Sequence, residues 1–365
     1  MEGKMFMQRA LDLAKLGAGF VNPNPMVGAV IVKDGKIIGE GYHKKYGDLH
    51  AERNALKDCR ERGNNPKDAT IYVTLEPCCH HGKTPPCTEA IIESGISKVV
   101  IGTLDVNPLV AGRGAEILSN SGIRVEIGLL EKECKELNRI FNKYMTEKRP
   151  YVLMKYAMTA DGKIATVSGE SKWITGEKAR ENAHKLRKRF AGIMVGVSTV
   201  ISDNPSLDCR LDESTKNPVR IICDSYLRTP LDATVVKTAN EIETIIATSS
   251  EDKEKIAQYQ ERGCKVLVVP SSEKGINLKY LMKALGEMGI DSVLLEGGGT
   301  INYSALESKI VDEIHIHMAP KIFGGNSKSP VEGLGISDIS QAVKLNPIRT
   351  TWAGKDLIIE NEVIY

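Results

Sequence analysis

Apolar residues along the chain follow two spacings in turn, one typical of strands and one typical of helices. The segment VGAVIVKDGKIIGEGYH (27–43) has two apolar runs around Asp34-Gly35, a dipeptide that favours a tight hairpin turn. A helix is predicted from His50 to Arg62, ending at Gly63. The strands ATIYVTLEP and KVVIGTLD follow, with the helix CTEAIIESG between them. This alternation predicts an α/β fold.

A second series of elements begins after the polar run TEKRP (146–150), which we interpret as a linker. A charged helix is predicted before it, from Glu131 to about Tyr144. After it, strands are predicted in YVLMKYAMTADGKIA, GIMVGVSTV, VRIICD, ETIIAT, KVLVV, SVLLEGGG and EIHIHMAP. Because so many strands need a core of their own, we place a domain boundary near residue 148, with domains at 1–147 and 148–365.

Composition narrows the class of protein. The 365 residues have a hydrophobic fraction of 41% and a formal net charge of +2, so no basic excess favours nucleic acid. No apolar run is long enough to span a membrane. The start, MEGKMFMQRALDLAKLG, predicts an amphipathic helix with Met5, Ala10, Leu13 and Leu16 along it, not a signal peptide. We therefore expect a cytoplasmic protein whose eight cysteines are reduced.

Two motifs with metal-ligating residues fall at the ends of predicted elements. HAE (50–52) begins a helix, and TLEPCCHHGKTPPC (74–87) joins a strand end to the next helix. One imidazole and two thiolates, from His50, Cys78 and Cys87, would hold Zn²⁺ and leave a fourth position for water, as in catalytic zinc sites. Zinc lowers the pKa of that water and so yields hydroxide, and Glu52 could carry the proton to a leaving amine. This pattern is typical of zinc-dependent deaminases.

The spacing of the two cysteines departs from the C-x-x-C of that pattern, because eight residues separate them. Cys79 directly follows the first and should point away from the same ion. The intervening CHHGKTPP is expected to form a loop over the mouth of the site. His80, His81 and Lys83 on this loop are predicted substrate contacts, with Lys83 suited to a phosphate.

Two alternatives for the first half remain open. A closed structural zinc module could use His80 or His81 with the three clustered cysteines, although it leaves the pair His50 and Glu52 unexplained. A deaminase of nucleic-acid bases would share the zinc chemistry. It would need a basic groove and stacking aromatic residues, whereas the aromatic content is 5%.

Residues of the second half give weaker signals. EGGG (296–299) follows a predicted strand and precedes the helical TINYSALES, so its backbone N–H groups could bind phosphate. A tight turn without a ligand is the alternative. VGVSTVISDNPSLDCR places the polar residues Asp203, Asn204 and Arg210 after a predicted strand, which is also what a solvated loop looks like.

The first half resembles the bifunctional deaminase/reductase family of riboflavin biosynthesis, on the segments NPNPMVGAVIV, GYHKKYGDLHAE and TLEPCCHHGKTPPC. The resemblance implies a cytidine-deaminase-like, three-layer α/β/α domain with zinc on His50, Cys78 and Cys87. It makes Glu52 the proton shuttle. Asn24, in the PNP turn, is expected to read the pyrimidine, with a simple turn-forming role as the alternative.

The second half resembles the reductase domain of the same family, with KYAMTADGKIA, SGESKWITG, TVISDNPSLDCR and LLEGGGTINYSAL in order. The resemblance implies a dihydrofolate-reductase-like α/β domain that uses NADPH. The residues implied to face the cofactor are Ala157, Trp173, Thr199, Asp203, Ser225, Gly298, Gly299, Thr300, Ile301, Asn302, Tyr303 and Ser304. Those implied to face the substrate are Ser171, Arg187, Leu207, Arg210 and Glu296. Lys155 and Asp203 are the candidate catalytic residues, and for Trp173 a role in closing the domain core is the alternative.

Together these similarities imply a two-step enzyme. The N-terminal domain would hydrolyse the 2-amino group of 2,5-diamino-6-ribosylamino-4(3H)-pyrimidinone 5′-phosphate. The C-terminal domain would reduce the ribosyl group with NADPH, giving 5-amino-6-(5-phosphoribitylamino)uracil. Two arginines in the second site suit a phosphate monoester. A zinc nucleobase deaminase with a non-catalytic C-terminal scaffold is the alternative, and a homo-oligomer, dimer or tetramer, is expected.

Overall fold

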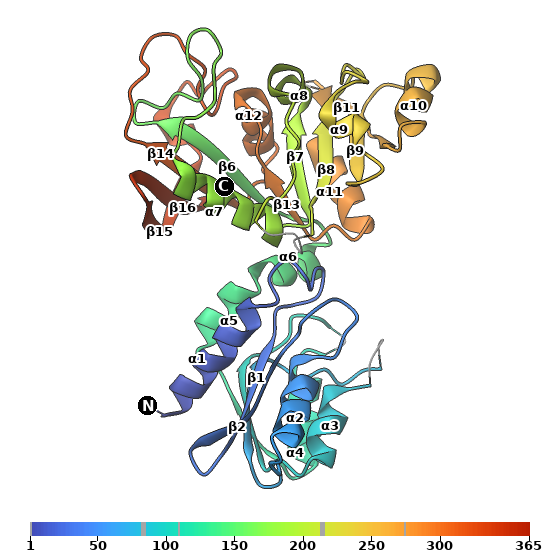
Figure 1. The fold of residues 1–365 in the computed structure, drawn as a ribbon, viewed down its shortest axis with the longest axis vertical. Coiled ribbons are helices and arrows are strands. Elements are labelled where there is room, and N and C mark those ends of the chain that lie inside the picture. Colours follow the sequence, from blue (N-terminus) through green and yellow to red (C-terminus); the bar gives the residue numbers. More distant parts are fainter. Residues whose placement is uncertain (1, 82–84, 109, 212–215, 274) are drawn as a thin grey trace. The chain divides into compact units, whose positions relative to one another are not determined.

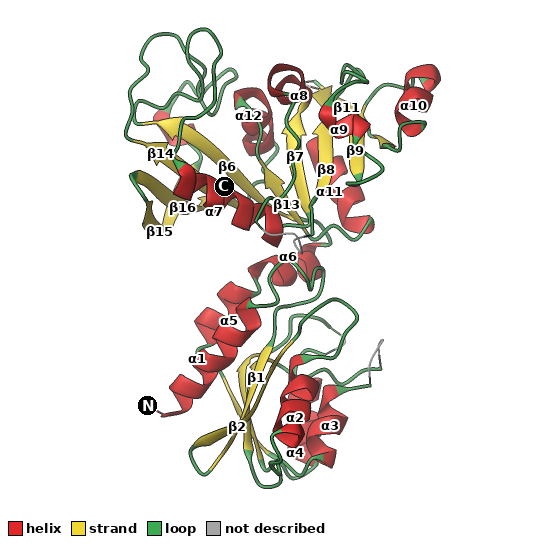
Figure 2. Cartoon of the chain, in the orientation of Figure 1, coloured by secondary structure: helices red, strands yellow, loops and turns green. Residues whose placement is uncertain are grey.

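Two large β-sheets organise the chain, and each belongs to a separate unit. The computed structural model describes residues 2–81, 85–108, 110–211, 216–273 and 275–365 (Figure 1). Its contacts define the units Met1–Lys148 and Arg149–Tyr365. Helices and strands alternate through both, as Figure 2 shows, so the predicted α/β class is confirmed. No helix in the described ranges is long and apolar enough to cross a membrane.

The first unit has a five-stranded sheet in the order β2-β1-β3-β4-β5. β1 pairs antiparallel with β2 and β3, whereas β3, β4 and β5 run parallel. The strands are β1 (Gly28–Lys33), β2 (Lys36–Tyr42), β3 (Thr70–Leu75), β4 (Lys98–Thr103) and β5 (Arg124–Ile127). The helices are α1 (Glu2–Lys15), α2 (Ala51–Glu61), α3 (Cys87–Glu93), α4 (Arg113–Asn120), α5 (Glu131–Leu137) and α6 (Arg139–Glu147).

Alternate residues of β1 enter two different cores, because successive side chains of a strand point to opposite faces. Ala29 and Ile31 pack with α2, α3 and α4, whereas Val30 and Val32 pack with α1 and α5. Figure 1 shows these two groups of helices on opposite sides of the sheet. The unit is therefore the expected three-layer α/β/α fold.

Helix α2 lies directly on strand β2, and glycine makes this possible. A Cβ atom at Gly41 would be 2.3 Å from the nitrogen of Ala55 and 2.5 Å from the oxygen of Ala51. A side chain there would push α2 away from the sheet. The close contact fixes the position of the N-terminus of α2, where the HAE motif lies.

The prediction of one continuous charged helix from Glu131 to about Tyr144 is wrong, because the helix is interrupted at Asn138 and forms α5 and α6. The Asn138 side chain accepts a hydrogen bond from Met26 N (2.8 Å) and donates one to Met26 O (2.9 Å). The helix also continues to Glu147, into the stretch interpreted as a linker. Met5 in α1 and Leu16 just after it do not face the core, since both are more than half exposed.

The second unit has a nine-stranded sheet in the order β10-β9-β8-β7-β13-β6-β14-β16-β15. The first seven strands in this order, from β10 to β14, run parallel to one another. β16 pairs antiparallel with β14, and β15 pairs antiparallel with β16. Its strands are β6 (Tyr151–Thr159), β7 (Gly192–Gly196), β8 (Val219–Cys223), β9 (Thr244–Thr248), β10 (Lys265–Val268), β13 (Ser292–Leu295), β14 (Glu313–Ala319), β15 (Lys344–Ala353) and β16 (Asp356–Ile364), with a small hairpin of β11 (Ser271–Ser272) and β12 (Gly275–Ile276).

Helices cover both faces of this sheet. Ile193 and Ile222 pack with α8, α9 and α10, whereas their neighbours Met194 and Ile221 pack with α11 and α12. The helices are α7 (Glu177–Arg189), α8 (Val197–Asp203), α9 (Thr234–Lys237), α10 (Lys253–Gln260), α11 (Leu278–Glu287) and α12 (Gly299–Glu307), with a 3-10 turn η1 (Ile339–Gln341).

Two elements of this unit differ from prediction. The predicted strand GIMVGVSTV ends at Gly196, and its second half forms α8, in which Val197 and Val200 are buried. A β-branched sequence thus becomes helical because tertiary packing outweighs local propensity. The hairpin of β15 and β16 was not predicted, since exposed polar residues interrupt its apolar pattern.

Candidate active sites

Three metal-ligating side chains meet at one point of the first unit. His50 caps α2, Cys78 follows β3, and Cys87 is the first residue of α3. His50 Nδ1 lies 3.4 Å from Cys78 Sγ and 3.5 Å from Cys87 Sγ. Tetrahedral zinc with sulfur and imidazole ligands needs donor atoms about 3.6 Å apart, so this donor set fits zinc.

The closed alternative finds no counterpart in this arrangement. The cluster contains neither Cys79 nor a second histidine among the residues that the structure describes. The His81 side chain is 75% exposed, and its Nε2 lies 3.8 Å from Glu89. Three protein donors leave a tetrahedral ion with one open position, which is typical of catalytic zinc.

The Glu52 carboxyl group lies beside these donors but is not part of the cluster. Its side chain is 3% exposed. Burial, together with the charge of Cys78, raises the pKa of Glu52 to about 7. A carboxyl group with a pKa near neutrality can both accept and return a proton at physiological pH.

A cavity of about 270 Å³ opens onto the cluster. It is lined by Asn24 and His80, both predicted from the sequence, and by three residues that the prediction missed, His43, Asp105 and Asn107. His43 lies in the quoted segment GYHKKYGDLHAE and could have been noticed there. Burial and, more weakly, the charge of Glu76 raise the pKa of Asp105 to about 6. Lys83 lies outside the described residues.

The orientation of Asn24 is set by His43. His43 Nδ1 lies 3.2 Å from Leu49 O, so this nitrogen donates its proton to the carbonyl. His43 Nε2 is then an acceptor and takes a hydrogen bond from Asn24 Nδ2 at 3.3 Å. One amide proton and the carbonyl oxygen of Asn24 remain for a ligand in the cavity.

The loop between the two cysteines is fastened where it re-enters the core. Arg53, next to Glu52 on α2, donates hydrogen bonds to Pro85 O (3.2 Å) and Pro86 O (2.8 Å). Cys87 follows directly. The arginine therefore holds the second thiolate at its place beside α2.

In the second unit, several residues implied to face the cofactor follow the carboxyl ends of parallel strands. Ala157 lies near the end of β6, Thr199 follows β7, Ser225 follows β8 and Gly298 follows β13. Carboxyl ends of parallel strands meet at one edge of a sheet, where open α/β folds bind ligands. The topology thus brings these four positions to the same edge.

The glycine turn at this edge has room for a phosphate group. A Cβ atom at Gly298 would meet only Thr199 Oγ1, at 4.0 Å, so a side chain would fill open space. The turn leads into the N-terminus of α12, whose N–H groups favour anions. This fits a dinucleotide phosphate. Asn302 does not face this space, because its buried side chain donates hydrogen bonds to Gly297 O and Pro330 O.

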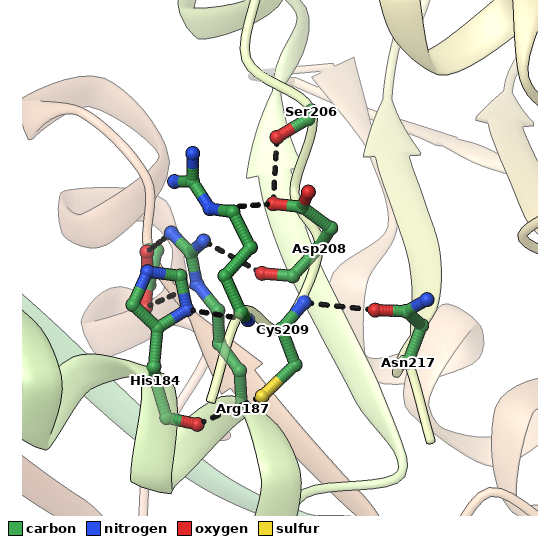
Figure 3. A network of polar contacts seen from close by, with 8 residues as sticks. His184, Arg187, Ser206, Asp208, Cys209 and Asn217 are labelled. Carbon is green, nitrogen blue, oxygen red and sulfur yellow. Dashed lines mark hydrogen bonds and ion pairs between the residues drawn. The ribbon is translucent and has the colours of Figure 1, made fainter. Parts of the chain in front are cut away.

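Arg187 is less available to a substrate than the sequence suggests (Figure 3). Its Nη2 lies 2.7 Å from Glu296 Oε2, its Nε lies 3.3 Å from Oε1, and its Nη1 donates to Asp208 O at 2.9 Å. Burial would raise the pKa of Glu296, but Arg187 and Lys155 outweigh it and lower that pKa to about 2. Glu296 is therefore ionised, pairs with Arg187 and interacts electrostatically with Lys155.

Arg210 is the freer arginine, because its side chain is 62% exposed and touches Asp208 at 3.3 Å. Its backbone N–H donates to His184 Nδ1 (3.2 Å), so a neutral His184 carries its proton on Nε2. His184 was missed by sequence reasoning, and it lies beside Arg187 in Figure 3. The Leu207 side chain is buried, so Leu207 can offer a ligand only its backbone.

The segment that contains Ser171 and Trp173 lies at the surface. Trp173 is 61% exposed, with the Arg180 guanidinium 4.6 Å from its ring, so it does not close a core. Lys172 Nζ donates to Asp203 O at 3.3 Å and thereby links this segment to the end of α8. The Asp203 carboxylate accepts a hydrogen bond from Ser202. Among the described residues, no hydrogen bond or ion pair links Asp203 to Lys155, the two candidate catalytic residues.

Comparison with known proteins assigns each unit to a domain family. The model of the cytidine and deoxycytidylate deaminase zinc-binding region matches residues 1–103, and that of the RibD C-terminal domain matches residues 150–359. The riboflavin biosynthesis protein RibD of Actinobacillus pleuropneumoniae is 56% identical over 98% of this chain and 95% of that protein. RibD of Escherichia coli is 38% identical over 98% and 99%.

Solved structures are similar over the whole length. A diaminohydroxyphosphoribosylaminopyrimidine deaminase/5-amino-6-(5-phosphoribosylamino)uracil reductase from Thermotoga maritima superposes with a TM-score of 0.89 at 41% identity, covering 100% of this chain and 99% of that one. RibD of Acinetobacter baumannii gives a TM-score of 0.88 at 34% identity, with the same coverage.

Fold and sites together define a zinc-dependent deaminase joined to a reductase in one chain. Its cofactors are Zn²⁺ in the first unit and NADPH in the second. The chain belongs to the RibD family of bifunctional enzymes of riboflavin biosynthesis. A second unit that is only a scaffold is not supported, since it matches the reductase domain.

Replacing Glu296 by glutamine should destabilise the second unit, because Arg187 and Lys155 would keep buried charges without their partner. We expect a loss of about 3–5 kcal/mol in unfolding free energy near neutral pH. The folded pKa of about 2 lies below the ordinary 4.5, so this contribution is complete above about pH 4.5 and disappears as the pH falls towards 2. Tryptophan fluorescence in urea reports this unit alone, since Trp173 and Trp352 both belong to it.

The control is Glu181→Gln, which removes an exposed carboxylate on α7. It should shift the urea midpoint little. A Glu296→Gln variant as stable as the wild type at pH 7, or a difference that grows below pH 4, would contradict the charge assignment.

Proposed function

We propose that the first unit hydrolyses the 2-amino group of 2,5-diamino-6-ribosylamino-4(3H)-pyrimidinone 5′-phosphate and releases ammonia. The observation that carries the proposal is the three-donor cluster of His50, Cys78 and Cys87 with the buried Glu52 beside it. The Thermotoga maritima relative is described as a deaminase of this diaminopyrimidine class. A cavity of about 270 Å³ suits one ring with part of its sugar phosphate.

Different side chains of the first unit carry out different parts of the proposed deamination. Zinc, when bound by the three donors, acidifies a water molecule at its open position. Glu52 accepts a proton on its carboxylate and delivers it to the amino group that leaves the ring as ammonia. Asn24, held by His43, offers its carbonyl oxygen and one amide proton to the pyrimidine edge. His80 and Lys83 belong to the loop proposed to contact the phosphorylated sugar.

The second unit reduces the ribosyl group of the deaminated product to ribityl. NADPH supplies a hydride, and the protein orients cofactor and substrate. We assign the glycine turn at Gly298 to the cofactor phosphates and Arg210 to the substrate phosphate. Lys155, whose positive charge is favoured by the nearby Glu296 carboxylate, gives a proton to the ring oxygen of the ribose. This step accompanies hydride transfer to the ribose carbon, whose bond to that oxygen breaks. Arg187 supports Glu296 rather than binding phosphate with both arms of its guanidinium.

Glu52→Gln should keep zinc and lose ammonia release by about 100- to 10,000-fold, because the amide cannot accept the proton. Zinc content by mass spectrometry and ammonia by a coupled enzyme assay measure the two effects. Glu61→Gln, at the exposed end of the same helix, should match the wild type. Unchanged turnover in Glu52→Gln would remove the proton-shuttle assignment.

Arg210→Met should raise the reductase KM for the 5′-phosphorylated substrate about 10- to 100-fold, because a charged hydrogen bond to phosphate is lost. The kcat should change little. NADPH oxidation is followed by absorbance, with the same substrate lacking phosphate as a reference, for which wild type and variant should agree. Lys185→Met removes an exposed charge from α7 and serves as the control. An equal effect on both substrates would exclude a phosphate contact.

We propose that two copies of the chain associate through β15, the edge strand of the nine-stranded sheet. Leu345, Ile348 and Trp352 on this strand are 39%, 39% and 73% exposed, and Ile339 just before it is 91% exposed. An edge strand that exposes several apolar side chains suits antiparallel pairing with a second copy across a two-fold axis.

The cytoplasm is the proposed location, supported by eight free thiols.

Glutamates at Ile348 and Trp352 should convert the oligomer to smaller species, because charges would be buried at the paired edge. Light scattering during gel filtration gives the molar mass. Met5→Glu, which adds a charge at an exposed apolar position of α1, is the matched control. A wild-type protein with the mass of one chain, or a double variant that keeps the wild-type mass, would contradict pairing through β15.

A further inference from the structure

Glu76 is a buried carboxylate that the deamination chemistry does not use. It lies between β3 and Cys78, and its side chain is 3% exposed. Its Oε2 accepts hydrogen bonds from the backbone N–H groups of Asp105 (3.1 Å) and Gly112 (2.9 Å), and its Oε1 accepts one from Ala115 (3.1 Å). One side chain therefore fastens three points of the segment 105–115.

The fastened segment is a wall of the deaminase cavity. Asp105, Asn107 and Val110 line the cavity, as Glu76 itself does, and all three lie within the segment 105–115 that Glu76 holds. The segment runs from the end of β4 into the first turn of α4, and its described residues include no strand. The three bonds from Glu76 therefore act together with local turn bonds, such as Asn107 N to Asp105 Oδ1 (2.8 Å), to fix where these side chains stand.

The same segment also packs directly against the turn that contains Cys78. A Cβ atom at Gly114 would be 2.2 Å from Pro77 O, so the start of α4 is pressed against the residue that precedes the ligand. Glu76 Oε1 and Cγ are the next nearest atoms, at 3.2 and 3.3 Å. Glu76 therefore links the cavity wall to the turn that contains Cys78, so that the two should keep a fixed relative position.

We propose that Glu76 is a positioning residue of the deaminase, which sets substrate affinity by fixing the wall that contains Asp105 and Asn107 relative to Cys78. Its carboxylate oxygens face backbone donors, so it acts through the wall. The role rests on the proposed deamination. It predicts that loosening the wall changes how well the substrate is held much more than how fast the held substrate reacts.

Glu76→Gln is the test variant, because an amide keeps one acceptor oxygen but turns an N–H₂ group towards backbone donors. We expect KM for the diaminopyrimidine phosphate to rise about 10-fold while kcat stays within about 3-fold and zinc content is unchanged. Hydrogen exchange by mass spectrometry should show faster exchange in the peptide covering 105–115 and no change in the second unit. Glu116→Gln, an exposed carboxylate on α4, should resemble the wild type.

A double-mutant cycle with Asp105→Ala separates the explanations. If Glu76 acts through the wall, Glu76→Gln should raise KM much less when Asp105 is already truncated. A raised KM without faster exchange in 105–115 would indicate direct contact with substrate and overturn the positioning role. A lower kcat or zinc content at unchanged KM would overturn it as well. Wild-type protein that releases no ammonia would instead refute the proposed function.

Discussion

The deaminase centre depends on the direct backbone contact between α2 and β2. His50 and Glu52 stand at the start of α2, and the thiolates come from the turn after β3 and from the start of α3. One helix therefore places both the imidazole and the carboxyl group proposed to carry the proton. Because Gly41 has no side chain, the backbone of α2 can pack in van der Waals contact with the backbone of β2. A shift of one ångström would separate imidazole from sulfur, since the donor atoms are only 3.4–3.5 Å apart.

Each unit contains a buried glutamate, and the surroundings shift the pKa values of these two side chains in opposite directions. In the first, burial and the charge of Cys78 outweigh the weaker attraction of His50 and raise the pKa of Glu52 to about 7. In the second, Glu296 is paired with Arg187 and stays ionised down to low pH. One carboxyl group is thus prepared to exchange a proton and the other to hold cations in place. The same side-chain type acquires opposite functions from its surroundings.

Local sequence signals predicted most strands, the α/β class and the cluster of His50, Cys78 and Cys87, because strand ends and helix starts place motifs without knowledge of long-range contacts. The α/β/α layering of the first unit came from the family resemblance. The features that were missed depend on residues far apart in the chain. Asn138 breaks a helix to pair with Met26, and Glu76 binds backbone groups up to 39 residues away. Such partners have no periodicity or motif, so only the folded chain shows them.

The anchoring of Pro85 and Pro86 by Arg53 has a consequence for how substrate preference can change. Since the chain is held on both sides of the loop, at Cys78 by the strand end and at Cys87 by the arginine, the length of the loop is uncoupled from the geometry of the donors. Insertions or exchanges between these two points leave the ion's ligands where they are. With the loop in the proposed role of substrate contact, evolution, or a designer grafting segments from other deaminases, can vary its sequence without rebuilding the metal-ligating cluster.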